Sequence, residues 1–120
     1  FITRTEPGKE TQDILSQVAL RILEEFRWPK SMRWGSRKVS WVRPIQGFLC
    51  LFNEKVVSFT YAGINTSDKT YGHRFLAPQP FQVKDFKDYE KKLKDHYVIL
   101  DWQERRDLIQ KEIERIADNL

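Results

Sequence analysis

The chain has 120 residues, 40% of them hydrophobic and 13% aromatic, which is enough apolar material for the core of one domain. Its longest unbroken apolar stretch, Gly47 to Phe52, is far shorter than the roughly 20 residues of a membrane-spanning helix, so a transmembrane helix is excluded. The net charge of +4 permits a nucleic-acid partner without requiring one, and the single cysteine, Cys50, excludes an internal disulfide and is expected to be a small buried apolar residue.

The first predicted elements are a strand end and a long helix. Phe1 to Thr5 alternates apolar and polar residues, as a strand does. Thr11 to Arg27 is predicted to be an amphipathic helix, and Pro29 ends its pattern. The apolar residues that recur every fourth position of this helix are Ile14, Val18, Ile22 and Phe26.

The middle of the chain is predicted to be a loop followed by strands. Pro29 to Lys38 lacks periodicity and reads as a loop, whereas the residues after it are rich in Val, Phe, Trp and Tyr. Asn53-Glu54 can close a hairpin, and Gly63 to Lys69 is polar and turn-like. The predicted strands are Val39 to Arg43, Ile45 to Phe52, Lys55 to Ala62, Thr70 to Leu76 and Phe81 to Val83.

Helices return in the last third of the chain. Asp85 is expected to cap a short helix, and the apolar run from Tyr97 to Leu100 suits a buried strand. Asp101 with Glu104 resembles a capping box at the start of the last helix. The pattern as a whole predicts an α+β fold, a mainly antiparallel sheet with flanking helices, as one domain over residues 1–120.

Few residues carry recognisable chemistry. No GxGxxG or GxxxxGK[ST] pattern is present, which excludes ATP binding by either phosphate loop, and the few soft ligands are too scattered to predict a metal site. His73 could support acid–base work, but we favour a histidine at a strand end that bonds the backbone or a loop. His96 is interpreted as the C-terminal residue of a helix.

Positive charge is concentrated between residues 27 and 43. This stretch holds six basic residues and no acidic one, and therefore has a charge of +6. Because the whole chain has a net charge of +4, the remaining residues together have a net charge of −2. Cations beside flat aromatic rings suit a phosphate backbone with unstacked bases. Alternatively, the tryptophans of this stretch are core anchors and the arginines pair with carboxylates elsewhere. The tryptophans concerned are Trp28, Trp34 and Trp41.

The chain resembles the β subunit of bacterial glycine–tRNA ligase in the order and spacing of three motifs: PKSMRWG at 29–35, WVRPI at 41–45 and TYGHRFL at 70–76. It departs from the family at Asn65 to Asp68, where a Ser-Gly-Asn type turn is common, and at Asn53-Glu54, which lacks the usual glycine. The chain begins at Phe1 rather than at a methionine, so we expect a fragment, from the N-terminal half of such a subunit.

The resemblance implies a cytoplasmic enzyme of two α and two β subunits. Its α subunits would carry the site for glycine and for ATP with Mg²⁺, and its longer β subunits would engage tRNA-Gly. This fragment would then hold no catalytic residue, cofactor or metal, and its partners would be the α subunit, the rest of the β subunit and tRNA-Gly, with no membrane.

Two hypotheses for the fragment follow. In the first it contacts tRNA, and the candidate residues are Lys30, Arg33, Trp34, Arg37, Lys38, Arg43, His73 and Arg74. In the second it is a structural module that packs against other domains and buries Trp28, Trp34 and Phe75. A generic nucleic-acid-binding domain is a further alternative. Hydrolytic editing with His73 is disfavoured, because a tight pocket excludes everything larger than glycine sterically.

Overall fold

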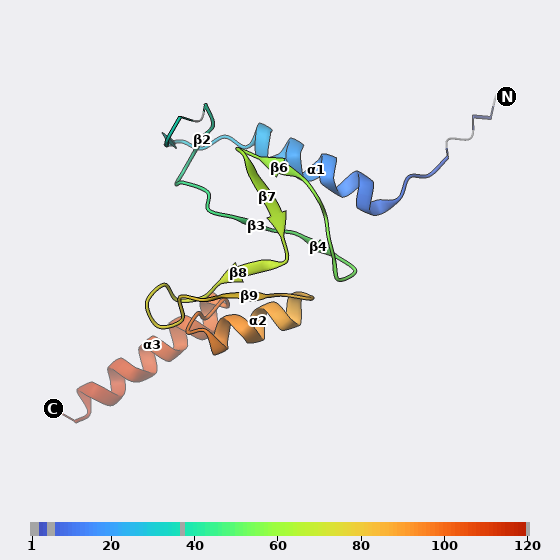
Figure 1. Ribbon diagram of the computed structural model, residues 1–120. Helices are drawn as coiled ribbons and strands as arrows, with labels where there is room; N and C mark the ends of the chain where they lie inside the picture. The colour runs from blue at the N-terminus through green and yellow to red at the C-terminus, as the bar shows by residue number, and fades with distance from the viewer. Residues whose placement is uncertain (1–2, 5–6, 37, 120) are drawn as a thin grey trace. The chain divides into compact units, whose positions relative to one another are not determined.

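The computed structural model describes residues 3–4, 7–36 and 38–119 (Figure 1). Within them the chain forms three helices and nine short strands, and four of the five strand pairings are antiparallel. The predicted α+β class is confirmed, although the strands form several small sheets rather than one. The chain divides into two compact units, Phe1–Asp68 and Lys69–Leu120. That residues 1–120 act as one domain stays a prediction.

Helix α1 (Thr11–Glu25) opens the first unit and ends two residues before the predicted boundary at Arg27. It packs against strand β6 (Thr60–Tyr61): the Tyr61 hydroxyl donates to the Leu23 carbonyl at 3.2 Å. The apolar stripe beside this contact is still 40–54% exposed, and its residues are Ile14, Val18, Ile22 and Phe26. Most of the predicted strand at Phe1 to Thr5 lies outside the described residues.

The strands of the first unit are shorter than predicted. Ile45 to Phe52 divides into β3 (Phe48–Leu49) and β4 (Leu51–Phe52), and Lys55 to Ala62 divides into β5 (Lys55–Val56) and β6. The divisions arise because β4 pairs with β5, whereas β3 and β6 pair with β7 (Ile64–Ser67). Each of these two predicted strands therefore contributes one short strand to the β4–β5 pair and another to the sheet of β3, β7 and β6.

Two further predictions for the first unit were wrong. Gly63 to Lys69 was expected to be a turn but contains β7; the turn is at Ala62-Gly63, whose φ angles are 51° and 69°. The predicted loop at Pro29 to Lys38 contains β1 (Met32–Arg33), which pairs antiparallel with β2 (Ser40–Trp41). The predicted hairpin at Asn53-Glu54 is confirmed, with both residues at positive φ.

Cys50 lies between β3 and β4 and is half-buried. Burial raises the pKa of its thiol, which keeps it protonated and therefore a poor nucleophile. Cys50 was expected to be a small buried apolar residue, and the structure buries it only in part.

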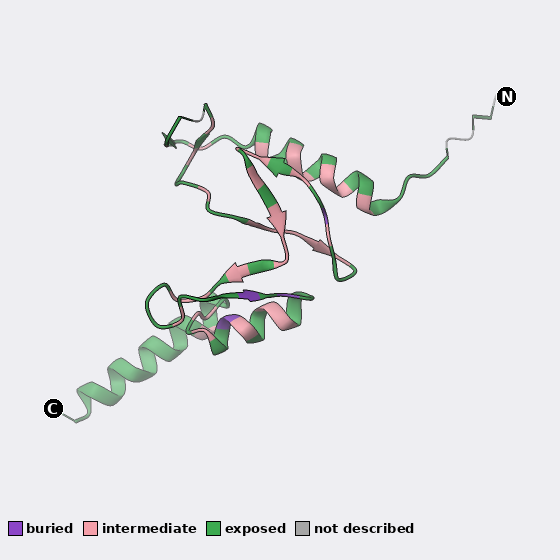
Figure 2. Ribbon diagram, viewed as in Figure 1, coloured by how far each residue is buried: buried purple, intermediate pink, exposed green. Residues whose placement is uncertain are grey.

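The second unit is an antiparallel strand pair with two helices. Strand β8 (Lys69–Tyr71) pairs with β9 (Pro80–Gln82), and helices α2 (Phe86–Asp95) and α3 (Trp102–Ala117) follow. Three of the buried core residues belong to this unit: Phe81, Val83 and Leu93. In Figure 2 helix α3 is exposed along almost its whole length.

The caps at Asp85 and Asp101 were predicted correctly, but the capping box expected from Asp101 with Glu104 does not form among the described contacts. Asp85 Oδ1 accepts the Asp88 N–H at 2.8 Å, and Asp101 Oδ1 accepts the N–H groups of Gln103 and Glu104. The Glu104 carboxylate is directed to Lys94 Nζ, 2.6 Å away, and so links α3 to the end of α2. Asp101 therefore acts as an ordinary N-cap.

Two strand predictions in the second unit need correction. Tyr97 to Leu100 is not a strand, because Tyr97 has a positive φ of 62° and the Val98 N–H turns back to the Leu93 carbonyl at 2.8 Å. The strand expected at Thr70 to Leu76 ends at Tyr71, and a turn closed by the hydrogen bond from the Ala77 N–H to the His73 carbonyl follows.

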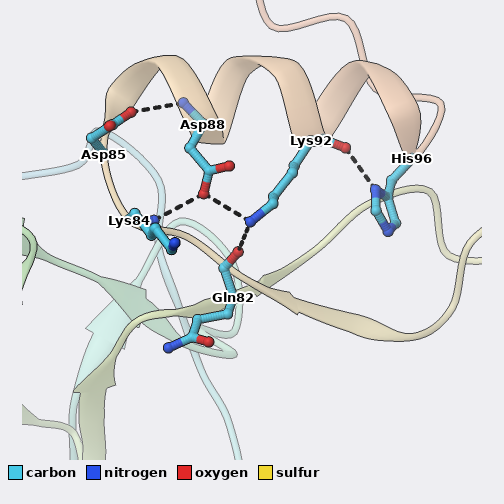
Figure 3. A network of polar contacts seen from close by, with 6 residues as sticks. All are labelled: Gln82, Lys84, Asp85, Asp88, Lys92 and His96. Atoms are coloured by element: carbon cyan, nitrogen blue, oxygen red, sulfur yellow. Dashed lines mark hydrogen bonds and ion pairs between the residues drawn. The ribbon is translucent and has the colours of Figure 1, made fainter.

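A polar network joins α2 to strand β9 (Figure 3). Lys92 Nζ donates to Asp88 Oδ2 and to the Gln82 carbonyl, both at 2.8 Å, and Asp88 also accepts the Lys84 N–H at 3.0 Å. These hydrogen bonds, first that from Lys92 and then that from Lys84, lower the pKa of Asp88. The folded state therefore favours the ionised form of the Asp88 carboxylate.

Candidate nucleic-acid interface

The basic stretch between residues 27 and 43 lies on an aromatic cluster. The Trp28 ring centroid is 4.6 Å from that of Phe26 and 5.3 Å from that of Trp41, and Trp41 in turn is 6.2 Å from Tyr61. Trp28 Nε1 is buried without a hydrogen-bond partner in the described part of the chain, so packing rather than polar contact holds this indole. Trp28 and Trp41, both half-buried, are therefore packed into this cluster.

Trp34 differs from the other two tryptophans. It is half-buried, and within the described ranges its ring belongs to none of the aromatic pairs. It follows β1 directly and precedes Gly35, whose φ of 58° turns the chain. Trp34 is thus the tryptophan of this stretch that lies outside the aromatic cluster.

The β1–β2 pairing determines which way Arg33 points. Met32 is opposite Trp41 and Arg33 is opposite Ser40. Because neighbouring side chains of a strand lie on opposite faces, the Trp41 ring faces the cluster while Arg33 and Ser40 face away from it. The ribbon is reinforced by a 2.7 Å hydrogen bond from Ser40 Oγ to Ser31 Oγ.

The described cations of this stretch are exposed and form no ion pair with a described carboxylate. Apart from Arg37, which lies outside the described residues, none of the predicted cations here forms an ion pair with a described acidic residue. The predicted cations that the structure describes here are Lys30, Arg33, Lys38 and Arg43. Arg27 behaves differently, since its Nη1 donates to the Glu24 carbonyl at the end of α1 at 2.8 Å. The expectation that the arginines pair internally is not met for Arg33 and Arg43.

The two remaining candidates, His73 and Arg74, belong to the second unit. His73 Nδ1 accepts the N–H groups of Phe75 and Leu76, and no carboxylate of the described chain pairs with its ring. These contacts agree with the interpretation of a histidine that bonds a loop. Arg74 is exposed.

The sequence points to Phe75 only as a residue that a structural module would bury against another domain; in the structure Phe75, the last residue of the GHRF motif, is 82% exposed. The available signal was the pair Phe75-Leu76 beside Arg74 in a segment closed by prolines, which is an unusual composition for a solvent-facing turn. The described residues contain no cluster of three or more His, Cys, Asp or Glu side chains able to hold a metal ion. No described helix is both long and apolar enough to cross a membrane.

Comparison with protein families places this α+β fragment among the subunits of aminoacyl-tRNA synthetases. The family model described as glycyl-tRNA synthetase beta subunit matches residues 1–120. The chain belongs to this family, and the resemblance inferred from its motifs is confirmed.

Individual relatives agree with the family model. The chain is 42% identical over 113 residues to the glycine–tRNA ligase beta subunit of Cereibacter sphaeroides, covering 91% of this chain and 16% of the relative. It is 44% identical over 110 residues to that of Phenylobacterium zucineum, covering 91% and 16%, and 36% identical over 120 residues to that of Clostridioides difficile, covering 100% and 17%. The chain therefore spans about one sixth of the length of these relatives.

Proposed function

We propose that this chain is a non-catalytic domain of the β subunit of glycine–tRNA ligase and contacts the phosphate backbone of tRNA-Gly through its basic stretch. The observation that carries the proposal is the group of exposed cations without carboxylate partners in the described chain: Lys30, Arg33, Lys38 and Arg43. Such cations are available to replace the counterions of RNA, which is the main source of affinity for a phosphate backbone.

Trp34 adds a second component to the proposed contact. It lies next to Arg33 in the chain, and its half-exposed indole offers a face on which an unpaired base can stack. Phosphate contacts position an RNA without reading its sequence, so the domain would hold tRNA-Gly rather than identify it. Arg37, His73 and Arg74 stay in the proposed set as further candidates.

In the whole enzyme the reaction would take place elsewhere. The proposal assigns glycine and ATP with Mg²⁺ to the α subunit, and it places the α₂β₂ enzyme in the cytoplasm. The α subunit, the rest of the β subunit and tRNA-Gly are the partners of this domain.

The test is tRNA-Gly binding by the α₂β₂ enzyme, measured between about 50 and 200 mM salt. We expect Arg33→Gln and Arg43→Gln each to weaken binding and to reduce the slope of log K against log salt by roughly 0.7 to 0.9, the value for one lost phosphate contact. The control is Arg21→Gln, because Arg21 is exposed but paired with Glu25 on α1. Unchanged slopes for both variants would refute the phosphate contact.

A second candidate function is a purely structural module, and helix α3 favours it. The apolar side chains of α3 are 48–61% exposed: Trp102, Leu108, Ile109, Ile113 and Ile116. An amphipathic helix is stabilised mainly by packing of its apolar face, so this face requires a neighbour in the whole enzyme. Unchanged tRNA binding in the variants above, together with lower thermal stability, would favour this candidate.

A further inference from the structure

The GHRF motif forms a turn whose shape is fixed by hydrogen bonds. His73 Nδ1 accepts the N–H of Phe75 at 3.3 Å and that of Leu76 at 3.2 Å, and the Ala77 N–H donates to the His73 carbonyl at 2.9 Å. Since Nδ1 accepts, the proton of the neutral ring is on Nε2. The imidazole thus does what Asp or Ser does at a helix N-cap, holding the amides two and three residues further along the chain in place.

The turn is also anchored to the core of the second unit. The His73 N–H donates to the His96 carbonyl at 2.9 Å, and Gly72 approaches His96 so closely that there is no room for a side chain at position 72. The His96 ring lies 4.3 Å from the buried Phe81 ring, and its Nδ1 is 2.7 Å from the Lys92 carbonyl (Figure 3). The base of the turn is therefore held by β9 and the end of α2.

This rigid turn presents apolar side chains to water. Phe75 is 82% exposed and Leu76 is 62% exposed, and the exposed Arg74 beside them forms no ion pair with a described acidic residue. A side chain held ready for contact loses little further conformational entropy when it binds. A large aromatic side chain on such a support is the usual form of an interface anchor.

Two observations indicate what covers this anchor. Residues 69–120 contain eleven Lys and Arg and ten Asp and Glu, so this unit lacks the positive charge of an RNA surface, and Leu76 has no flat ring to stack on a base. In addition, the chain spans only about one sixth of its relatives' length. A segment of the same polypeptide would be present at high effective concentration whenever the turn is formed, which suits apolar side chains as exposed as these.

We propose that the GHRF turn is an intrachain docking element: Phe75 and Leu76 enter an apolar pocket formed by another segment of the full-length β polypeptide, and Arg74 meets a carboxylate at its rim. The inference is independent of the RNA contact proposed for residues 27–43, since a different unit carries it. It makes His73 a positioning residue, so that His73 and Arg74 would act as tRNA contacts only if the experiment below overturns it.

The experiment is photo-cross-linking in the α₂β₂ enzyme, with p-benzoylphenylalanine in place of Phe75, in the presence and absence of tRNA-Gly. We expect an intramolecular cross-link to a β-subunit peptide outside residues 1–120, formed equally with and without tRNA. A cross-link to the α subunit, to the second β copy or to tRNA would overturn the proposal, as would the absence of any cross-link.

A pair of His73 variants tests the positioning role in the same assay. His73→Asn retains an acceptor at the position of Nδ1 and is expected to keep the cross-link yield within about twofold of the parent. His73→Ala leaves the two amides without an acceptor and is expected to lower the yield several-fold. Equal yields from both variants would show that the hydrogen-bonded turn does not position Phe75.

Discussion

The backbone N–H of His73 donates a 2.9 Å hydrogen bond to the carbonyl oxygen of His96, and Gly72 makes this approach possible. A Cβ at position 72 would stand against the Cβ of His96 and 2.6 Å from its carbonyl oxygen. Neither the Cβ nor the carbonyl oxygen of His96 can be moved aside by a side-chain rotation.

Gly72→Ala is therefore expected to destabilise the second unit by about 1–3 kcal/mol, the usual cost of overpacking. The measurement is hydrogen exchange of the α2 amides in the β subunit. Gly47→Ala is the matched control, because nothing lies within 4 Å of a Cβ at position 47. Equal protection in the two variants would contradict the close approach.

The β4–β5 hairpin has a residue unsuited to its conformation. Glu54 has a φ of 62°, and a two-residue turn with positive φ at both positions favours Asn-Gly. Glu54→Gly should remove the steric cost of a side chain there and stabilise the hairpin by about 1 kcal/mol, seen as slower hydrogen exchange of the strand amides. Glu54→Ala keeps a Cβ, so it should give no such gain; a gain from Ala would show that the charge, not the backbone, matters.

The α2 network is expected to make local stability depend on pH. Hydrogen bonds from Lys92 and Lys84 lower the pKa of Asp88 from its usual 3.8, so the folded state favours the carboxylate. This contribution is present above the unfolded pKa and is lost as the pH falls through the lower folded pKa.

Asp88→Asn should therefore reduce the protection of the α2 amides near neutral pH, and its difference from the parent should shrink below about pH 4. Asp95→Asn, at the other end of the same helix, is the control. A difference that stays constant down to about pH 2 would show that ionisation of Asp88 has no part in the effect.

The helices and their caps were predictable from the sequence, whereas strand boundaries were not. The apolar period of α1 and the caps Asp85 and Asp101 are local signals. Strand β7 was missed because Asn65 and Thr66 are polar; the Thr66 hydroxyl in fact exchanges hydrogen bonds with the backbone of Phe59, a partner that composition does not reveal. Strand pairing depends on distant segments, so its register is not contained in a local pattern.

Local sequence patterns were also insufficient to define the candidate tRNA surface. Residue types and spacing identified the basic stretch and made Trp34 alone of its three tryptophans a tRNA candidate, but they also allowed Trp34 to be a buried packing residue. Trp41 is opposite Met32 in the β1–β2 ladder and enters the aromatic cluster, whereas Trp34, beyond the end of β1, does not. Only the ladder and the turn at Gly35 separate the ring inside the cluster from the ring outside it.

This distinction gives a prediction about tRNA binding. Trp34→Ala should weaken the affinity of the α₂β₂ enzyme for tRNA-Gly by roughly tenfold, the size expected for one lost base stack, with little change in thermal stability. Trp41→Ala removes a ring from the aromatic cluster and should instead destabilise the first unit by on the order of 3 kcal/mol.

The two variants are compared by equilibrium tRNA binding and by thermal denaturation of the same preparations. Because the rings are chemically identical, a difference between the variants reports their surroundings. If Trp34→Ala lowers thermal stability as Trp41→Ala does and leaves tRNA affinity unchanged, the Trp34 ring serves packing, and the structural-module function is the better one for this stretch.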